Sequence, residues 1–254
     1  MKITFLGTGT SQGTPLIGCK CRVCTSTDAR DKRLRSSVLI DVEGQKILID
    51  AGPDFRQQML QAEISNLDAI LLTHEHIDHV GGLDDVRALN YINNKAAEIY
   101  AEYRVQKALH KTFYYAFEAV KYPGIPEFKF NTINEKNFHV GEIEVIPIRA
   151  YHYKLPVFGF RIKNFCYLTD ANEIPPQELK KMYNADIVVI NALRHKPHLS
   201  HFCLREALEI INKLKPKRTY LTHISHQLDL HSTLEKELPA NVFAAYDGLV
   251  VDCF

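Results

Sequence analysis

The sequence predicts an α/β fold in which two mixed β-sheets pack face to face and helices cover their outer sides. Two observations support this prediction. Strand-like segments fall into two groups along the 254-residue chain, and helix-like segments follow each group. The apolar runs Ala69–Leu72 and Ile187–Ile190 are typical of strands that are buried on both faces. Because no linker, composition break or low-complexity tract divides the chain, we expect residues 1–254 to form one domain.

The first group of strands begins near the N-terminus. Lys2–Thr10 is predicted to be a strand that ends in a glycine-rich turn, without the third glycine of a dinucleotide-binding loop. An irregular insertion at about 16–34 follows. Further strands are expected at Ser37–Val42, Lys46–Asp50, Asp68–Thr73 and Ala97–Ala101. Helices are expected from Pro53, a residue suited to a first helical position, to Gln61, from after Gly82 to about Asn93, and over Val105–Val120.

The second group of strands lies in the C-terminal half. Residues 126–169 are β-rich, and strands are expected at Glu142–Arg149, Val157–Ile162 and Phe165–Thr169. A helix, a strand and a second helix follow at Pro176–Tyr183, Asp186–Asn191 and His201–Leu214. The chain then ends in strands near Arg218–Thr222, Val242–Ala245 and Leu249–Asp252.

The composition excludes some classes of protein. Lys and Arg number 31 against 30 Asp and Glu, a balance that argues against a protein acting mainly on DNA or RNA but leaves room for a local basic patch. The N-terminal residues lack the apolar core of a signal peptide, and no stretch approaches the roughly 18 apolar residues of a transmembrane helix. We therefore expect a cytoplasmic protein without a membrane partner.

The run His74-Glu75-His76-Ile77-Asp78-His79 gives the strongest functional signal, because it directly follows a predicted strand. Imidazole and carboxylate together suit zinc, manganese or iron. On an extended chain His74 and His76 project to the same side and could share one ion, whereas Asp78 and His79 could serve a second ion. The alternative is a solvated histidine-rich loop, which the preceding strand and the following Gly81-Gly82 disfavour.

This run resembles the His-x-His-x-Asp-His signature of the metallo-β-lactamase superfamily, whose fold is a four-layer αββα sandwich. The superfamily's other motifs match in order along nearly the whole chain, at Asp50, His152, Asp170 and His223. The resemblance implies that one metal ion is held by His74, His76, His152 and Asp170, and the other by Asp78, His79, Asp170 and His223. It also implies that Asp50 orients the histidine loop, although Asp50 could be an ordinary strand-end acid.

The resemblance also narrows the chemistry. β-Lactamases usually have cysteine where this chain has Asp170, whereas phosphodiesterases and thioester hydrolases of the superfamily keep a carboxylate. In ribonuclease Z and related phosphodiesterases a histidine precedes the fifth motif, and His201 matches it. We expect His201 to open the helix Phe202–Leu214, where the helix N-terminus favours anions, and to be catalytic. The alternative is a surface helix cap. His195 and His198 have no assigned role.

Three cysteines, Cys19, Cys21 and Cys24, crowd together in the insertion. Three thiolates need one more ligand to complete a tetrahedral zinc site, and His226 is the candidate. This arrangement is similar to the cyclic phosphodiesterases of phosphonate degradation, which act on a phosphoribosyl cyclic phosphate and have a structural zinc in a cysteine-rich insertion. The alternative is three reduced thiols with no metal, with His226 a bystander.

These features predict a hydrolase with two divalent metal ions, zinc or manganese or iron, and one structural zinc. The hypothesis is that a hydroxide bridging the two ions attacks a small cyclic or nucleotide-like phosphodiester. Asp78 would accept a proton, and His201 would stabilise the transition state or protonate the leaving oxygen.

Three other functions stay open. One is a ribonuclease Z-like RNA phosphodiesterase, which the chain disfavours because it has no long glycine-rich basic arm between His79 and His152 and because Lys111–Phe117 is typical of a core or interface helix. Another is a glyoxalase II-like thioester hydrolase, which has no need of His201. The last is a non-enzymatic accessory or carrier protein of cofactor biosynthesis. A homodimer is expected from the relatives.

Overall fold

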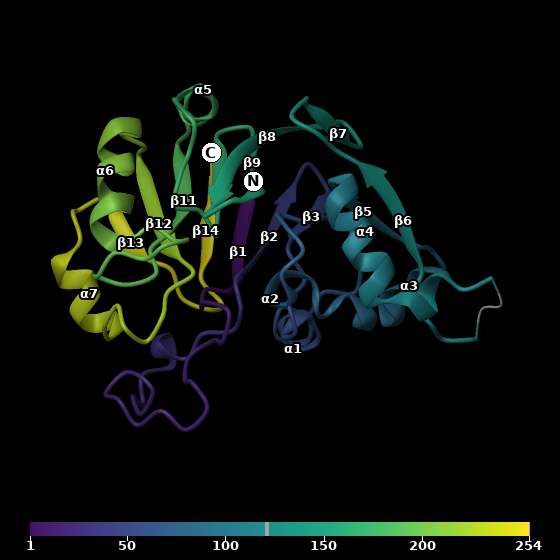
Figure 1. Cartoon of the computed structure of the whole chain (residues 1–254), viewed down its shortest axis with the longest axis horizontal. Coiled ribbons are helices and arrows are strands. Elements are labelled where there is room, and N and C mark those ends of the chain that lie inside the picture. Colours follow the sequence, from purple (N-terminus) through teal and green to yellow (C-terminus); the bar gives the residue numbers. More distant parts are fainter. Residues whose placement is uncertain (120–121, 254) are drawn as a thin grey trace.

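Two β-sheets lie face to face in the computed structural model, which describes residues 1–119 and 122–253 (Figure 1). Within these residues each sheet has seven strands, and helices cover the outer side of each sheet. Three buried apolar clusters separate the layers, one between the sheets and one under each set of helices. The predicted α/β class and four-layer αββα arrangement are therefore confirmed.

The first sheet is built mainly from the N-terminal half. Its strand order is β14 (Val250–Asp252), β1 (Lys2–Gly7), β2 (Ser37–Val42), β3 (Gln45–Ile49), β4 (Ala69–Leu71), β5 (Ala97–Ala101) and β6 (Phe128–Thr132). Strands β3 to β6 are parallel, and the others pair antiparallel. On this side lie α1 (Phe55–Gln61), α2 (Ile77–Val80), α3 (Val86–Asn93) and α4 (Tyr103–Thr112), as Figure 1 shows.

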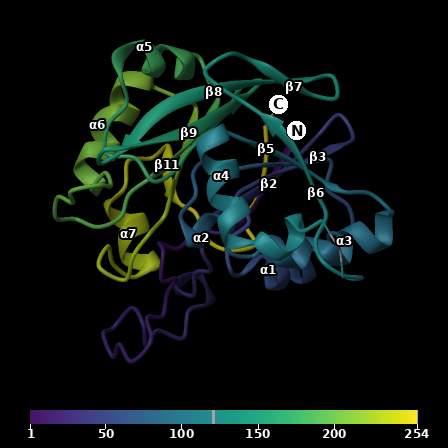
Figure 2. The same ribbon diagram turned by 45° about the vertical axis from the view of Figure 1, so that its right-hand side comes forward.

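The second sheet is built from the C-terminal half. Its order is β13 (Val242–Ala244), β12 (Arg218–Thr222), β11 (Ile187–Asn191), β10 (Phe165–Leu168), β9 (Leu155–Ile162), β8 (Ile143–His152) and β7 (Phe138–Val140). Helices α5 (Pro176–Leu179), α6 (Leu204–Leu214) and α7 (His231–Glu237) cover it. The cysteine-bearing segment, purple in Figure 2, projects from the body of the molecule.

The layer between the sheets holds the two halves together. Phe5 of β1 packs against Tyr220 of β12 with ring centroids 5.4 Å apart, and Ile49, Phe158 and Phe160 in the same cluster are fully buried. Each such side chain contributes roughly 1.5–3 kcal/mol through burial. The strand ends of the two sheets are thereby held in fixed positions relative to each other, as a site shared between them requires.

Two predicted helix boundaries in the N-terminal half of the chain were wrong. The helix predicted over Val105–Val120 ends at Thr112, and its predicted end at Val120 lies outside the described residues. A short 3-10 turn follows, in which Phe117 packs on Phe128 and Phe130 with centroids 5.8 and 5.7 Å apart. The aromatic part of Lys111–Phe117 therefore contributes apolar packing within the protein. Helix α1 begins at Phe55 rather than at Pro53, after Asp54 has paired with Arg35.

The α-helices that the sequence did not indicate are short. They are α2 within the histidine run and α7 near the C-terminus. None of the helices in the described part of the chain combines the length and the apolar character needed to cross a membrane.

Candidate metal centre and active site

The predicted ligands lie at the ends of strands from both sheets. Asp50 follows β3, Asp170 lies two residues after β10, and His223 follows β12. All three adopt left-handed backbone conformations, with φ of 63°, 52° and 54°. This conformation is costly for residues other than glycine and persists where the surroundings impose it, often at functional sites. The strand ends are therefore shaped to turn these side chains into the site.

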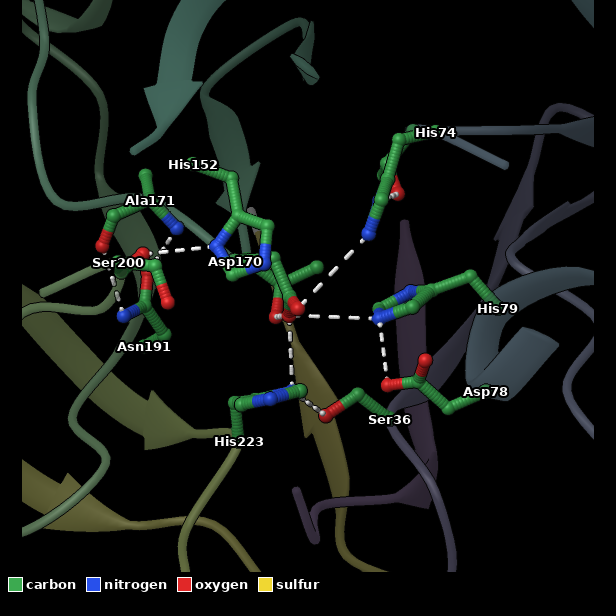
Figure 3. Close-up of polar contacts among 12 residues, drawn as sticks. Ser36, His74, Asp78, His79, His152, Asp170, Ala171, Asn191, Ser200 and His223 are labelled. Atoms are coloured by element: carbon green, nitrogen blue, oxygen red, sulfur yellow. Dashed lines mark hydrogen bonds and ion pairs between the residues drawn. The ribbon is translucent and has the colours of Figure 1, made fainter. Parts of the chain in front are cut away.

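Asp170 lies at the centre of the site (Figure 3). Its Oδ1 is 2.8 Å from Nδ1 of His223 and 3.3 Å from Nε2 of His79, and its Oδ2 is 3.9 Å from Nε2 of His74. The ligand atoms of His74, His76 and Asp170 lie within 4.8 Å of one another, as do those of His79, Asp170 and His223. One buried carboxylate is thus shared by two groups of imidazoles, in the position predicted for a bridging ligand.

Two more predicted ligands lie at the edges of these groups. Asp78 reaches the second group, with its Oδ2 at 3.2 Å from Nε2 of His79. The ring of His152 is 5.1 Å from that of His76, and its ligand atom lies with those of Asp170 and His201. The side chain of Glu75 is not part of the site and forms an ion pair with Arg104. The structure therefore brings together all seven residues that the sequence nominated for the dinuclear site.

Neighbouring groups fix which nitrogen faces the centre in two of the imidazoles. His79 donates from Nδ1 to Oδ2 of Asp50 over 2.7 Å, and His152 donates from Nδ1 to the carbonyl of Ser200 over 2.8 Å. In each neutral ring the other nitrogen, Nε2, is then left as an acceptor. Asp50 has the orienting geometry that the resemblance implies.

The residues present fit divalent cations. Nε2 of His74 and Nε2 of His79 are buried without a hydrogen-bond partner, and both face carboxylate oxygens. Two acceptors in such contact require a positive charge between them, and buried polar atoms are rarely left unpaired. Imidazole and carboxylate together form a donor set for zinc, manganese or iron. The site therefore has the composition of a centre for divalent metal ions.

In the protein without metal, the pKa shifts of His79, Asp170 and His74 also indicate a site for a cation. Burial lowers the pKa of His79, but the carboxylates of Asp170, Asp50 and Asp78 raise it well above its usual range. Burial raises the pKa of Asp170, but His223 and His79 bring it well below its usual range. Burial also keeps the pKa of His74 well below its usual range, so this ring is a neutral acceptor. Without metal the centre attracts a proton, which is the smallest cation that can fill this place.

The structure corrects the predicted environment of His201. Helix α6 begins at Leu204, because the N–H of Cys203 is capped by the Glu206 carboxylate at 2.9 Å. His201 lies in the loop before the helix, stacked on His223 with centroids 4.8 Å apart and next to His152 at 4.5 Å. His201 therefore does not lie at the N-terminus of α6.

Within the site, His201 is nearly buried, and its Nδ1 has no hydrogen-bond partner in the described residues. Burial, followed by the charge of His223, lowers its pKa to about 3, so the ring is neutral near pH 7. Its ligand atom lies within 4.8 Å of those of His152 and Asp170, a proximity that the sequence did not indicate. The ring of His198 lies next to that of His201, with centroids 5.1 Å apart, whereas His195 is exposed beside α6.

The cysteine cluster also comes together as predicted. Sγ of Cys19 and Sγ of Cys21 lie 3.4 and 3.3 Å from Nδ1 of His226, and Cys24 completes the group within 4.8 Å. Tetrahedral zinc bonds to sulfur and nitrogen imply an S···N separation of about 3.5 Å, close to these values. The N–H of Cys24 lowers the pKa of Cys21 to about 6, which favours the thiolate form that binds metal.

Several supporting residues were missed by the sequence reasoning. The side chain of Asn191 exchanges two hydrogen bonds of 3.0 Å with the backbone of Ala171, which fixes the loop just after Asp170 (Figure 3). The sequence did contain a signal for Asn191, because it is a polar residue at the end of a buried apolar strand. The carbonyl of Ser200 left no signal, because any residue could supply it. Ser36 lies 3.2 Å from Nδ1 of His223.

Comparisons with known proteins agree with this geometry. Residues 45–224 match the family model of the beta-lactamase superfamily domain. The chain therefore belongs to the beta-lactamase superfamily, as predicted. Within the superfamily it is similar along its whole length to a diphosphatase of the PhnP family, whose crystal structure has a TM-score of 0.93 and 38% sequence identity and matches 100% of this chain and 98% of that chain.

Other relatives are more distant or longer. The chain is 41% identical over 252 residues to a Porphyromonas gingivalis (strain ATCC BAA-308 / W83) protein named octanoyltransferase, and the match covers 98% of this chain but 51% of that protein. The chain thus spans about half the length of this relative. The short form of human tRNase Z has a TM-score of 0.72 at 22% identity, with 99% of each chain covered, and shares the fold. Zn²⁺-bound PqqB of Methylobacterium extorquens has a TM-score of 0.80 at 16% identity, with both chains covered completely.

Proposed function

We propose that this chain is a dinuclear-metal phosphodiesterase that hydrolyses a small cyclic or nucleotide-like phosphodiester. The observation that supports it most directly is the single buried carboxylate of Asp170 between two groups of imidazoles, with the unpartnered His201 beside it. A donor set of histidine and aspartate suits divalent metal ions, and His201 adds a group that can bond to a phosphate oxygen. The PhnP-family relative is named a diphosphatase, which is also phosphate chemistry.

The residues would divide the work as follows. One ion would be held by His74, His76, His152 and Asp170, the other by Asp78, His79, Asp170 and His223, with Asp50 holding His79 in position. Bound divalent ions supply Lewis-acid chemistry, since they lower the pKa of water and neutralise phosphate charge. The identity of these ions is proposed as zinc or manganese, and that of the cysteine site as zinc.

The protein's own groups would handle the protons. Burial raises the pKa of Asp78, but His79 lowers it below its usual range, so Asp78 is an ionised acceptor that could take a proton from the attacking water. His201 is neutral and could donate a hydrogen bond from a ring N–H to the leaving oxygen or to a phosphate oxygen. Burial of His201 excludes water from that bond, which strengthens it.

A second candidate is hydrolysis of a diphosphate linkage, which the name of the PhnP-family relative favours. Cleavage of a phosphoanhydride needs the same attack on phosphorus and the same stabilisation of oxygen charge. Octanoyl transfer is not proposed, because about half of the relative with that name lies outside the match.

The test is a substrate panel with metal-reconstituted protein. It would contain bis(p-nitrophenyl) phosphate, a 2′,3′-cyclic nucleotide, ADP-ribose, S-lactoylglutathione and an octanoyl thioester. We expect turnover of the phosphodiesters, loss of turnover after chelation, and recovery on adding zinc or manganese. Asp170→Asn should be inactive and Asp41→Asn, on β2, fully active. Turnover of a thioester without turnover of any phosphate substrate would overturn the proposal.

A further inference from the structure

A pocket adjoins the candidate metal centre on the side of the second sheet. It has a volume of about 520 Å³, in the range of small-ligand sites. Two of its walls are the imidazoles of His76 and His152. The other lining residues are Tyr153, Lys154, Leu155, Leu199 and Ser200. A substrate with its phosphorus at the metal centre would extend its remaining part into this pocket.

The hairpin between β8 and β9 forms one wall of the pocket. His152 pairs with Leu155, so Tyr153 and Lys154 form a two-residue turn. The tight turns that hairpins prefer need a positive φ at their first residue, where glycine or asparagine is usual. Here Tyr153 occupies that position with φ of 58°. Glu43 and Lys163 occupy the same position in two other two-residue turns of the chain, each with φ of 51°, but Tyr153 is the one that lines the pocket.

The turn is also fixed to the loop that carries Asp170. The N–H of Tyr153 donates to Oδ1 of Asn172 over 2.5 Å, and the N–H of Asn172 donates to the carbonyl of Tyr151 over 2.9 Å. Asn172 lies two residues after Asp170. The backbone of Tyr153 is therefore tied to the loop that carries the shared metal ligand, and its side chain is half exposed.

The walls of the pocket combine an aromatic, an apolar and a positively charged side chain. Tyr153 offers an aromatic face, Leu199 is an apolar side chain that is 68% exposed, and the ammonium of Lys154 lies 5.4 Å from the centre of the Tyr153 ring. Lys154 makes no ion pair within the described residues. An aromatic face stacks planar rings, and an ammonium that no carboxylate neutralises attracts an anion.

We propose that this pocket binds the part of the substrate beyond the scissile phosphorus, and that this part is a nucleoside that carries a second phosphate. The base or another planar ring would stack on Tyr153 and contact Leu199, and the second phosphate would pair with Lys154. This inference rests on the proposed phosphodiesterase function and names its substrate class. A phosphodiester with only a small neutral group would leave the Lys154 ammonium with only the Tyr153 ring as its partner.

Two chromogenic substrates with the same scissile bond test the role of Lys154. They are thymidine 5′-(p-nitrophenyl phosphate) and its 3′-phosphorylated form. Lys154→Ala should lower kcat/KM about tenfold for the 3′-phosphorylated substrate, mainly through KM, and less than twofold for the other. Lys213→Ala, an exposed lysine near the far end of α6, should change neither. Equal effects on both substrates, or no effect on either, would overturn the role of Lys154.

Tyr153→Gly tests the ring without adding strain, because glycine adopts the positive φ readily. It should lower kcat/KM about tenfold for both thymidine substrates and leave methyl p-nitrophenyl phosphate unchanged. A uniform loss on all three substrates would indicate damage to the metal centre and contradict the stacking role.

Direct binding separates this inference from the proposed function. Calorimetry with thymidine 3′,5′-bisphosphate needs no turnover, and Lys154→Ala should weaken its binding about tenfold relative to the wild-type protein and Lys213→Ala. If no phosphodiester is hydrolysed but Lys154→Ala binds the bisphosphate more weakly, the phosphodiesterase proposal fails and the proposed role of the pocket in binding is supported. If phosphodiesters are hydrolysed but the bisphosphate does not bind, or binds equally to all variants, the pocket proposal fails alone.

Discussion

His79 and Asp50 form a hydrogen bond of 2.7 Å between Nδ1 and Oδ2, and neither side chain is exposed to solvent. Asp50 also accepts from the hydroxyl and from the backbone N–H of Thr73, both over 2.9 Å. The carboxylate is therefore held in place before it meets the imidazole. Because Asp50 takes the Nδ1–H, the tautomer of His79 is fixed with Nε2 toward Asp78 and Asp170.

Asp50→Asn should weaken metal binding at the dinuclear site. The amide keeps the shape of the carboxylate but removes its charge, so His79 loses its preference for the ligating tautomer. We expect the affinity for zinc to fall about 10–100-fold. Titration of metal-free protein against a competing chromophoric chelator measures this change, with Asp41→Asn as the matched control. Wild-type affinity in Asp50→Asn would refute the orienting role.

His201→Ala should keep its metal and lose turnover. The ring stacks on His223 and lies next to His152, but no backbone bond or cap depends on it. If it stabilises the leaving oxygen, kcat should fall about a hundred- to ten-thousand-fold. Steady-state kinetics on bis(p-nitrophenyl) phosphate and elemental analysis of the same sample measure both properties. His195→Ala, from the same loop but exposed, should behave as the wild type. A loss of metal in His201→Ala would instead make His201 a ligand, consistent with its proximity to Asp170.

The ligands could be predicted from the sequence because their positions follow from strand ends. The position of a residue that follows a buried strand is fixed by that strand. The apolar runs before Asp50, His74 and His223 indicate those strands. The ends of helices were harder to predict. Cys203 rather than His201 caps α6, because Glu206 supplies the partner of its N–H, and only tertiary structure shows that pairing.

The groups that support the ligands were beyond sequence reasoning for a different reason. The carbonyl of Ser200 positions His152, but a backbone atom has no residue signature. The turn at Tyr153 matters because of its φ, which follows from the pairing of β8 with β9 and from Asn172. Propensity would place glycine there, so the departure from propensity is visible only in the structure.

Cys21→Ser should remove one zinc ion and destabilise the fold. The insertion has few apolar side chains of its own, and metal binding to such a segment contributes directly to folding. In protein reconstituted with zinc alone, we expect the zinc content to fall by about one equivalent from about three. Differential scanning fluorimetry should show a lower Tm that added zinc does not restore. Cys203→Ser is the matched control, because serine is a favourable N-cap residue for α6. Equal metal content in both variants would contradict a zinc site at the cysteines.

A buried histidine outside the active site predicts a pH dependence of stability. His231, the first residue of α7, is 3% exposed, and its Nδ1 lies 3.5 Å from Nη2 of the buried Arg33. Its backbone N–H donates to Asp31 over 2.7 Å. Burial, followed by the charges of Arg33 and Arg30, lowers the pKa of His231 to about 4. Only the neutral ring can accept a hydrogen bond from Arg33.

The sign of the effect follows from this lowered pKa. The unfolded chain protonates His231 near pH 6.5 and the folded chain near pH 4, so the unfolded state binds more protons between these values. The stability that the neutral ring contributes is complete above pH 6.5 and is lost as the pH falls toward 4. We expect His231→Gln, which keeps an acceptor but does not titrate, to lose on the order of 2 kcal/mol less than the wild type between pH 7 and pH 5. Urea unfolding of chelator-treated protein at both pH values measures the difference. His139→Gln, an exposed histidine on β7, should follow the wild type, and an identical pH dependence in all three proteins would show that His231 is not protonated on unfolding in this range.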